Sequence, residues 1–154
     1  MSLTPLRLEN YFFTRVRTEA NLDFASAEGR VPDQSEIEVN TKVEVFRHNE
    51  DAARYQLIVT IDEASSDAGQ LPYEIEIQAV GFVTVNPGFE DGDVERLVYV
   101  NGASMLYTAA REYLLTITGR GPWGGFYLPT TNFHRPAQEA PADPTKQSKR
   151  KKKA

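Results

Sequence analysis

The sequence predicts an α+β fold in which a four-stranded antiparallel sheet packs with one long C-terminal helix. Two observations support this class. Before residue 86, apolar and polar side chains alternate with a period of two in four separate segments, as in half-buried strands. After Asn86 the apolar spacing changes to three and four residues, which is typical of an amphipathic helix. A chain of 154 residues is most simply one domain, large enough to bury a core.

The four alternating segments predict the strands of the sheet. They are residues 6–17, 36–48, 54–62 and 73–85. In the second and fourth segments, apolar side chains such as Val43 and Ile75 face one way and glutamates face the other. These glutamates are Glu36, Glu38, Glu44, Glu74 and Glu76. They predict a solvated, acidic outer face on an antiparallel sheet.

The segments that join the expected strands differ in length. Residues 49–51 and 65–72 are short and polar, which suits hairpins between antiparallel neighbours. Residues 18–35 form a longer connection that carries the apolar side chains Leu22, Phe24 and Val31. A connection of that length is usually functional or packed across the body of the domain.

The dominant helix is expected at residues 102–118. Residues 94–98 suit one or two earlier helical turns, which Asn101 and Gly102 are expected to interrupt. Asn101 can cap the start of the long helix and Gly119 can end it. Apolar side chains lie on more than one side of this helix, whereas one sheet covers only one stripe. The remainder is expected to meet a second copy of the chain through Met105, Leu106, Ala109 and Tyr113.

Charge divides the chain into an acidic body and a basic tail. Residues 1–133 hold 10 basic and 20 acidic side chains, a net charge of −10, whereas residues 134–154 hold 7 and 2, a net charge of +5. The acidic body argues against nucleic acid as the main partner. The tail is polar from Pro136 onward, so it has nothing to bury and is expected to be disordered. The predicted domain therefore covers residues 1–133, and a disordered basic tail covers residues 134–154.

The residues give no support to catalysis, cofactor binding or metal binding. The chain has no cysteine, and its two histidines, His48 and His134, are far apart in sequence. The glycines at positions 119, 121 and 124 spell G-x-G-x-x-G, but they follow a helix instead of a strand, so they indicate a helix end and a turn. No nucleophile motif or converging pair of carboxylates marks a catalytic site. We predict a protein that is not an enzyme and needs no cofactor.

Secretion and membrane insertion are not indicated either. The start of the chain lacks the basic and then apolar pattern of a secretory signal. No stretch approaches the roughly 20 apolar residues of a membrane helix. We therefore expect a cytoplasmic protein that does not insert directly into a membrane.

Aromatic residues are more numerous than one sheet face and one helix require. Several stand on expected loops or outward-facing strand positions, among them Phe46, Phe82 and Trp123. Each of them either fills the core or contributes to apolar surface that is kept for oligomerisation and a partner. The pattern alone leaves both interpretations open.

The order of elements and three short motifs resemble the SecB family of export chaperones. The motifs are Ala110-Arg111-Glu112, then Arg120-Gly121 after seven residues, and then Leu128-Pro129-Thr130-Thr131-Asn132-Phe133. The family pattern runs A-R-E, seven residues, R-G, then L-x-P-V-N-F. The chain departs from it after Phe133, where the family continues into a second amphipathic helix and this chain has its polar, basic tail.

The resemblance implies an assembly and a function. It implies a homotetramer, a dimer of dimers with outward sheets and with the long helices packed between dimers. It also implies ATP-independent binding of unfolded preproteins in apolar grooves, and handover to SecA, which would dock on the acidic outer face. Divergent members of the family serve toxin–antitoxin systems, so the alternative is a dedicated adaptor or antitoxin chaperone with one specific partner.

The client-binding surface is expected where the 18–35 connection lies beside the turn at residues 123–128. An unfolded segment offers apolar side chains and free backbone groups, so its receptor needs exposed apolar walls. The residues expected to form them are Leu22, Phe24, Val31, Trp123, Phe126 and Tyr127. Polar replacement of Phe24, Trp123 and Phe126 is then expected to leave stability unchanged, whereas the alternative is that these side chains only cover the core. Arg111 and Glu112 are expected to form a salt bridge or a capping pair near the oligomer interface.

Overall fold

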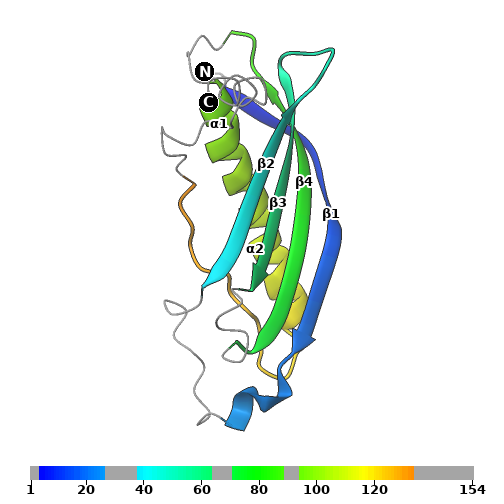
Figure 1. Ribbon diagram of the computed structural model, residues 1–154, viewed down its shortest axis with the longest axis vertical. Helices are drawn as coiled ribbons and strands as arrows, with labels where there is room; N and C mark the ends of the chain where they lie inside the picture. Colours follow the sequence, from blue (N-terminus) through cyan, green and yellow to red (C-terminus); the bar gives the residue numbers. More distant parts are fainter. Residues whose placement is uncertain (1–3, 27–37, 64–70, 89–93, 134–154) are drawn as a thin grey trace, which may run out of the picture.

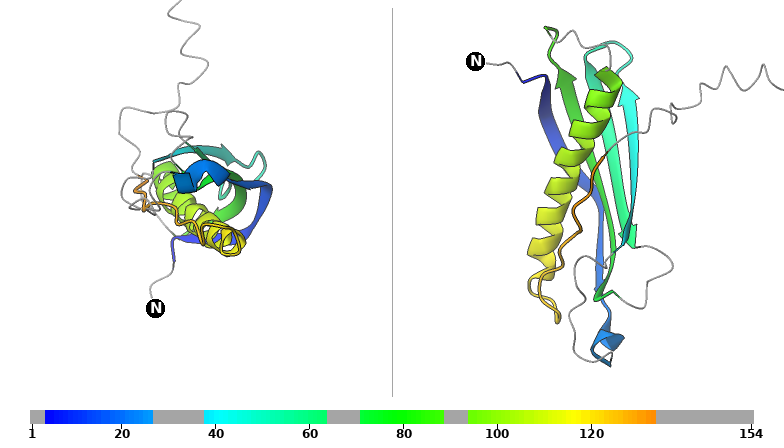
Figure 2. Two further views of the ribbon diagram at one scale, coloured as in Figure 1. Left: turned by 90° about the horizontal axis from the view of Figure 1, so that it is seen from below. Right: turned by 90° about the vertical axis from the view of Figure 1, so that its left-hand side faces the viewer.

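The computed structural model describes residues 4–26, 38–63, 71–88 and 94–133. Four antiparallel strands form one sheet in the order β1-β4-β3-β2, and a long helical segment lies across one of its faces (Figures 1 and 2). The strands are β1 (Leu6–Ala20), β2 (Val39–Arg47), β3 (Arg54–Glu63) and β4 (Tyr73–Val85). The predicted α+β class, with its four-stranded antiparallel sheet and C-terminal helix, is confirmed.

The strand boundaries follow the predicted ones closely. β4 covers the predicted residues, and β3 is longer by the single residue Glu63. β1 continues past the predicted end at Arg17 because it stays paired with the start of β4, with Ala20 opposite Tyr73. The predicted second strand began at Glu36, which lies outside the described residues. The short connection between β2 and β3 forms an antiparallel hairpin, as predicted.

The helical segment runs without interruption from Val94 to Thr118. α1 (Val94–Leu97) continues through a π-helical turn, η3 (Val98–Gly102), into α2 (Ala103–Thr118). The predicted interruption at Asn101 and Gly102 was therefore wrong. Asn101 does not cap α2, because its side-chain amide donates to the Leu97 carbonyl oxygen at 3.1 Å, one turn earlier. The predicted end at Gly119 is correct, and this residue follows the last residue of α2.

The core lies between the sheet and α2. Leu57 of β3 and Leu106 and Leu114 of α2 are fully buried there. The helix approaches the central strands closely because glycine is present at the contact. A Cβ atom on Gly81 would lie 2.7 Å from Cδ2 of Leu106, and one on Gly102 would lie 2.6 Å from Cδ2 of Leu57. Helix and sheet therefore fit together at positions where any larger residue would separate them.

After α2 the chain turns and runs back beside the helix, as the orange segment of Figure 2 shows. Phe126, Leu128 and Phe133 of this segment are buried in the core. The Phe133 ring meets the Tyr107 ring of α2 edge-on, with 5.5 Å between the centroids. The returning segment thus completes the layer over the sheet. In the described part of the chain, none of the helices combines the length and apolar character needed to cross a membrane.

Candidate client-binding surface and oligomer residues

Two apolar segments meet at the end of the molecule where β1 and α2 both end (Figure 1). The 3-10 helix η1 (Leu22–Ser26) follows β1, and a turn follows α2. The rings of Phe24 and Trp123 meet edge-on with 5.6 Å between centroids. The Trp123 indole Nε1 donates to the Asn21 carbonyl oxygen at 2.9 Å. The structure thus brings together the two segments that were predicted to carry the client-binding residues.

A buried tyrosine anchors the turn that carries Trp123. The Tyr73 hydroxyl donates to the Gly124 carbonyl oxygen at 2.7 Å and accepts from the Trp123 backbone N–H at 3.2 Å. Gly124 has a φ of 74°, in the left-handed region that glycine adopts without steric cost. Since Tyr73 begins β4, the turn is fixed to the sheet. The indole is therefore held in place before any ligand arrives.

The expected client-binding residues differ in exposure. Leu22 is 75% exposed and Tyr127 is 41% exposed. Phe24 and Trp123 are half-buried, each covering part of the other. Val31 lies outside the described residues. Four of the six expected residues therefore reach the surface of the described structure.

Phe126 is different because it belongs to the core. It is 3% exposed, and its ring packs edge-on against Tyr73. Its backbone N–H donates to Oγ1 of the buried Thr118 at 2.8 Å, which fixes the direction of the chain at this point. The expectation that Phe126 tolerates a polar replacement without loss of stability does not fit this burial. The alternation of inward and outward residues in the returning segment could not be read from the sequence, since it depends on this hydrogen bond.

The β4 glutamates of the expected acidic face are paired with arginines of β1. Arg17 lies 3.2 Å from Oε2 of Glu74, and Arg15 lies 2.6 Å from Oε1 of Glu76. The role of these arginines could not be predicted from the sequence, because β1 and β4 are neighbours in the sheet but not along the chain. The negative charge of this part of the face is therefore largely balanced within the subunit.

The glutamates near β2 do not share one environment. Glu44 is half-buried and lies 3.4 Å from Nζ of Lys42. Glu38 is exposed directly before β2. Glu36 lies outside the described residues. Among the described glutamates of this set, only Glu38 takes part in none of the ion pairs.

The four α2 residues expected at an oligomer interface do not share one environment. Leu106 is fully buried against the sheet of its own subunit, so it is not available to a second copy. Met105 and Ala109 are half-buried. Tyr113 is exposed and stacks on Phe13 of β1, with 4.6 Å between the ring centroids and 14° between the planes. An interface on α2 would thus extend onto β1.

Arg111 and Glu112 do not form the expected pair. No ion pair among the described residues joins them, because neighbouring helix positions point to different sides. The positive charge of Arg111 instead influences the pKa of the Tyr107 hydroxyl. Burial raises the pKa of the Tyr107 hydroxyl, while a hydrogen bond with Thr131 and the charge of Arg111 oppose that rise.

The described residues offer no obvious metal site: none of their histidine, aspartate and glutamate side chains gather in a group of three or more. What the scaffold presents instead is anchored and exposed apolar surface. A family model, Preprotein translocase subunit SecB, matches residues 18–139 of the chain. The chain therefore belongs to the SecB family, as its motifs indicated, and this membership supports a chaperone role.

Two solved structures share the fold. One is a SecB-like chaperone from Mycobacterium tuberculosis in complex with a ChAD peptide from the HigA1 antitoxin. It is 14% identical with a TM-score of 0.51, over 86% of this chain and 93% of that chain. The other, a protein of unknown function from Streptococcus agalactiae, is 15% identical with a TM-score of 0.51, over 84% of this chain and 100% of that chain. At these identities the likeness concerns the fold alone. A comparison with curated proteins gave no match.

Proposed function

We propose that the chain is an ATP-independent holdase that binds unfolded preproteins in the cytoplasm before export. The observation that carries this proposal is the apolar surface at the meeting point of η1 and the turn after α2, in a member of the SecB family. We call this set of residues the client surface. It consists of Leu22, Phe24, Trp123 and Tyr127.

The client surface suits an extended apolar segment for physical reasons. Trp123 is anchored by hydrogen bonds to two separate parts of the fold, so its ring gives a fixed wall. Leu22 stands almost free on η1, where a client side chain can cover it. Burying a side chain of that size stabilises a complex by about 1.5–3 kcal/mol. Such binding draws on apolar burial, which requires no nucleotide hydrolysis.

The proposal is tested by the suppression of aggregation of a chemically unfolded protein after dilution, without ATP. The double variant Leu22→Ser and Tyr127→Ser is expected to need more than about tenfold more chaperone for half-suppression, because it loses two exposed apolar contacts. Phe46→Ser is the matched control, since Phe46 is an exposed aromatic residue outside the client surface, on the face of the sheet turned away from α2. Failure of the wild-type protein to suppress aggregation, or an equal loss in the control, would contradict the proposal.

Handover to SecA is the second part of the proposal. The acidic residues that would carry it are Glu36, Glu38, Glu44, Glu74 and Glu76. The glutamates of this set that the structure describes lie on the sheet face turned away from α2 or directly before β2. A client bound at the client surface would therefore leave them accessible. Because Glu74 and Glu76 are paired with arginines and Glu44 with Lys42, Glu38 contributes most to this contact among the described members.

A second candidate function is that of a dedicated adaptor or antitoxin chaperone. The observation that favours it is the structural likeness to a SecB-like chaperone that was solved with an antitoxin peptide. An adaptor binds one partner tightly and shows little general suppression of aggregation. Toxin and antitoxin genes beside the gene for this chain, together with a negative result for several unrelated unfolded clients, would favour the adaptor over the holdase.

A further inference from the structure

The face of the sheet that is turned away from α2 changes its chemistry along the strands. Near the β2–β3 hairpin, Arg7 of β1 and Arg54 of β3 stand on either side of the same β4 residue. One step along, Phe82 of β4, Gln56 of β3 and Phe46 of β2 lie side by side. The glutamates of β4 come at the opposite end of this face. The hairpin end is thus basic and aromatic, whereas the predicted character of the outer face was acidic.

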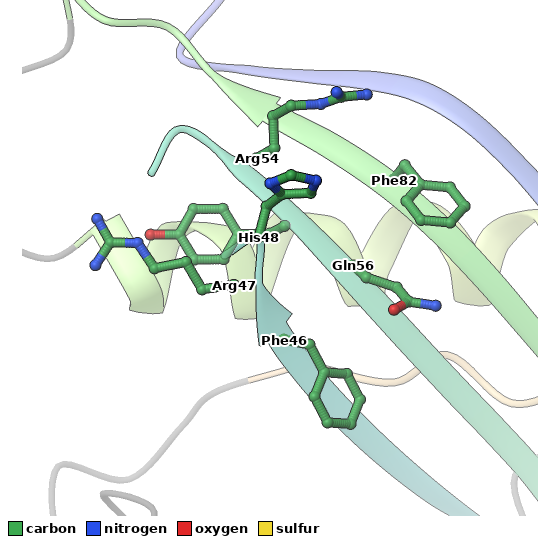
Figure 3. Close-up of a pocket in the computed structure, with 7 residues that line it drawn as sticks. Phe46, Arg47, His48, Arg54, Gln56 and Phe82 are labelled. Carbon is green, nitrogen blue, oxygen red and sulfur yellow. The ribbon is translucent and has the colours of Figure 1, made fainter. Parts of the chain in front are cut away.

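A hollow of about 230 Å³ lies at this hairpin end. Figure 3 shows its lining: Phe46 and His48 come from β2 and its end, Arg54 and Gln56 from β3, and Phe82 from β4. Arg47 of β2 and Tyr55 of β3 complete the lining. Among the described residues, no aspartate or glutamate lines it. We call this site the hairpin pocket.

Two hydrogen-bond donors of the hairpin pocket remain available to a ligand. Arg54 takes part in none of the ion pairs of the described residues. Nδ1 of His48 accepts the backbone N–H groups of Glu50 and Asp51, both at 3.1 Å, so the ring carries its hydrogen on Nε2. Arg47 is engaged elsewhere, because its guanidinium lies 6.0 Å from the Tyr55 ring centroid.

The aromatic part of the hairpin pocket is open as well. Phe46 is 49% exposed, although it stands on a strand whose apolar residues otherwise face the core. The carboxylates closest along the chain are Glu44, two residues before Phe46 on β2, and those of the hairpin connection, and none of them lines the pocket. Glu44 is paired with Lys42 at 3.4 Å, and Oδ1 of Asp51 accepts the backbone N–H of Ala53 at 3.0 Å. The pocket therefore combines an open apolar surface with an arginine, Arg54, that forms none of the ion pairs among the described residues.

We propose that the hairpin pocket binds a peptide segment of a partner protein in which an aromatic residue stands next to a carboxylate. The aromatic ring would lie on Phe46 and Phe82, and the carboxylate would accept hydrogen bonds from Arg54 and from Nε2 of His48. Charge complementarity selects an acidic segment, because cationic and neutral donors line the pocket without a carboxylate. This site goes beyond the holdase function, since it lies at the other end of the molecule from η1 and the client surface (Figure 1).

The experiment measures fluorescence anisotropy of a labelled peptide with an aspartate-phenylalanine repeat. Arg54→Gln is expected to weaken its binding about five- to tenfold, because it removes a charged donor. Phe46→Ser is expected to weaken it by a similar factor. Arg120→Gln, an exposed arginine outside the pocket, makes the same charge change as a control and stays within about twofold of the wild type. A peptide with asparagine in place of aspartate should not distinguish Arg54→Gln from the wild type.

Three results would overturn the proposal. One is tighter binding of a lysine-phenylalanine repeat than of the acidic peptide. Another is an equal loss of affinity in Arg54→Gln and Arg120→Gln. The third is a loss of self-association in Arg54→Gln, seen by light scattering, which would make the pocket a contact between copies of the chain. Since Arg54 and Phe46 are exposed, both variants are expected to fold, and unchanged suppression of aggregation by them keeps this test separate from that of the holdase.

Discussion

Glu63 ends β3 with a carboxylate oxygen that is shielded from water and accepts no hydrogen bond within the described residues. Burial raises the pKa of this carboxyl above its ordinary value of 4.5, and the charges of Glu74 and Asp62 add to the rise, while Arg17 opposes it. The folded protein therefore binds this proton more tightly than the unfolded chain does. The resulting stability is fully present below about pH 4.5 and is lost as the pH rises through the folded pKa.

Glu63→Gln is accordingly expected to raise the free energy of unfolding near neutral pH, because it removes a charge that the fold disfavours. The difference from the wild type should shrink as the pH falls, since the wild-type carboxyl then becomes protonated. Urea denaturation over a series of pH values measures this. Glu112→Gln, at an exposed position of α2, serves as the control. A difference that does not change with pH would contradict the assignment.

At the scale of elements, a single threonine joins the end of α2 to the returning segment. Oγ1 of Thr118 donates to the Leu114 carbonyl oxygen at 2.7 Å and accepts from the Phe126 N–H at 2.8 Å. Thr118 is 2% exposed, so water cannot reach this position to replace either hydrogen bond of its hydroxyl. This contact directs Phe126 into the core and leaves Tyr127 outside.

Thr118→Val keeps the shape of the side chain but leaves the buried N–H of Phe126 without an acceptor. The expected loss of stability is about 1–3 kcal/mol, measured as a shift of the urea midpoint. Thr116→Val is the matched control, because Oγ1 of Thr116 makes the same kind of bond, to the Glu112 carbonyl oxygen at 2.9 Å, but is exposed. Its loss is expected to stay within about 0.5 kcal/mol. Equal losses in the two variants would show that the Phe126 contact is unimportant.

At the scale of the whole molecule, apolar side chains remain exposed along β1 and α2. Tyr11 and Val16 of β1 and Tyr113 of α2 are all exposed, and β1 is an edge strand of the sheet. An exposed edge strand is open to pairing with another chain, and a large exposed apolar patch marks an interaction site. We propose that these residues, with Met105 and Ala109, form an interface of a homotetramer that is built as a dimer of dimers.

The double variant Tyr11→Glu and Val16→Glu is expected to dissociate this assembly, because it places charges in an apolar interface without partners. Light scattering should then report a smaller particle, while circular dichroism shows an unchanged fold. Phe46→Glu carries the same type of change at an exposed aromatic residue outside the proposed interface, and it should leave the mass unaltered. A wild-type monomer at micromolar concentration would remove the basis of the proposal.

The elements of this fold were predictable because each depends on neighbouring residues. Alternation within β3 and β4 is a property of consecutive positions, and it placed both strands to within one residue. The same local reasoning failed at Asn101 and Gly102. There, tertiary packing keeps the helix continuous, since Gly102 lies directly against Leu57 of the sheet. Glycine destabilises an isolated helix, but it is kept inside this one because no larger residue fits at the contact with the sheet.

The sequence by itself determined the fold class and the family, and it named the two segments of the proposed client surface, since periodicity and motif spacing are properties of neighbouring positions along the chain. Only the tertiary structure decided which side chains meet. The pairing of β1 with β4 places Arg17 beside Glu74, although β2 and β3 lie between these two strands in the sequence. The register of β2, β3 and β4 likewise gathers Phe46 and Phe82 at one end of the outer face. The physical reason is that the burial of the whole sheet against α2 fixes the register and the strand order. This energy depends on the complete fold, so it cannot be inferred from any short stretch of sequence.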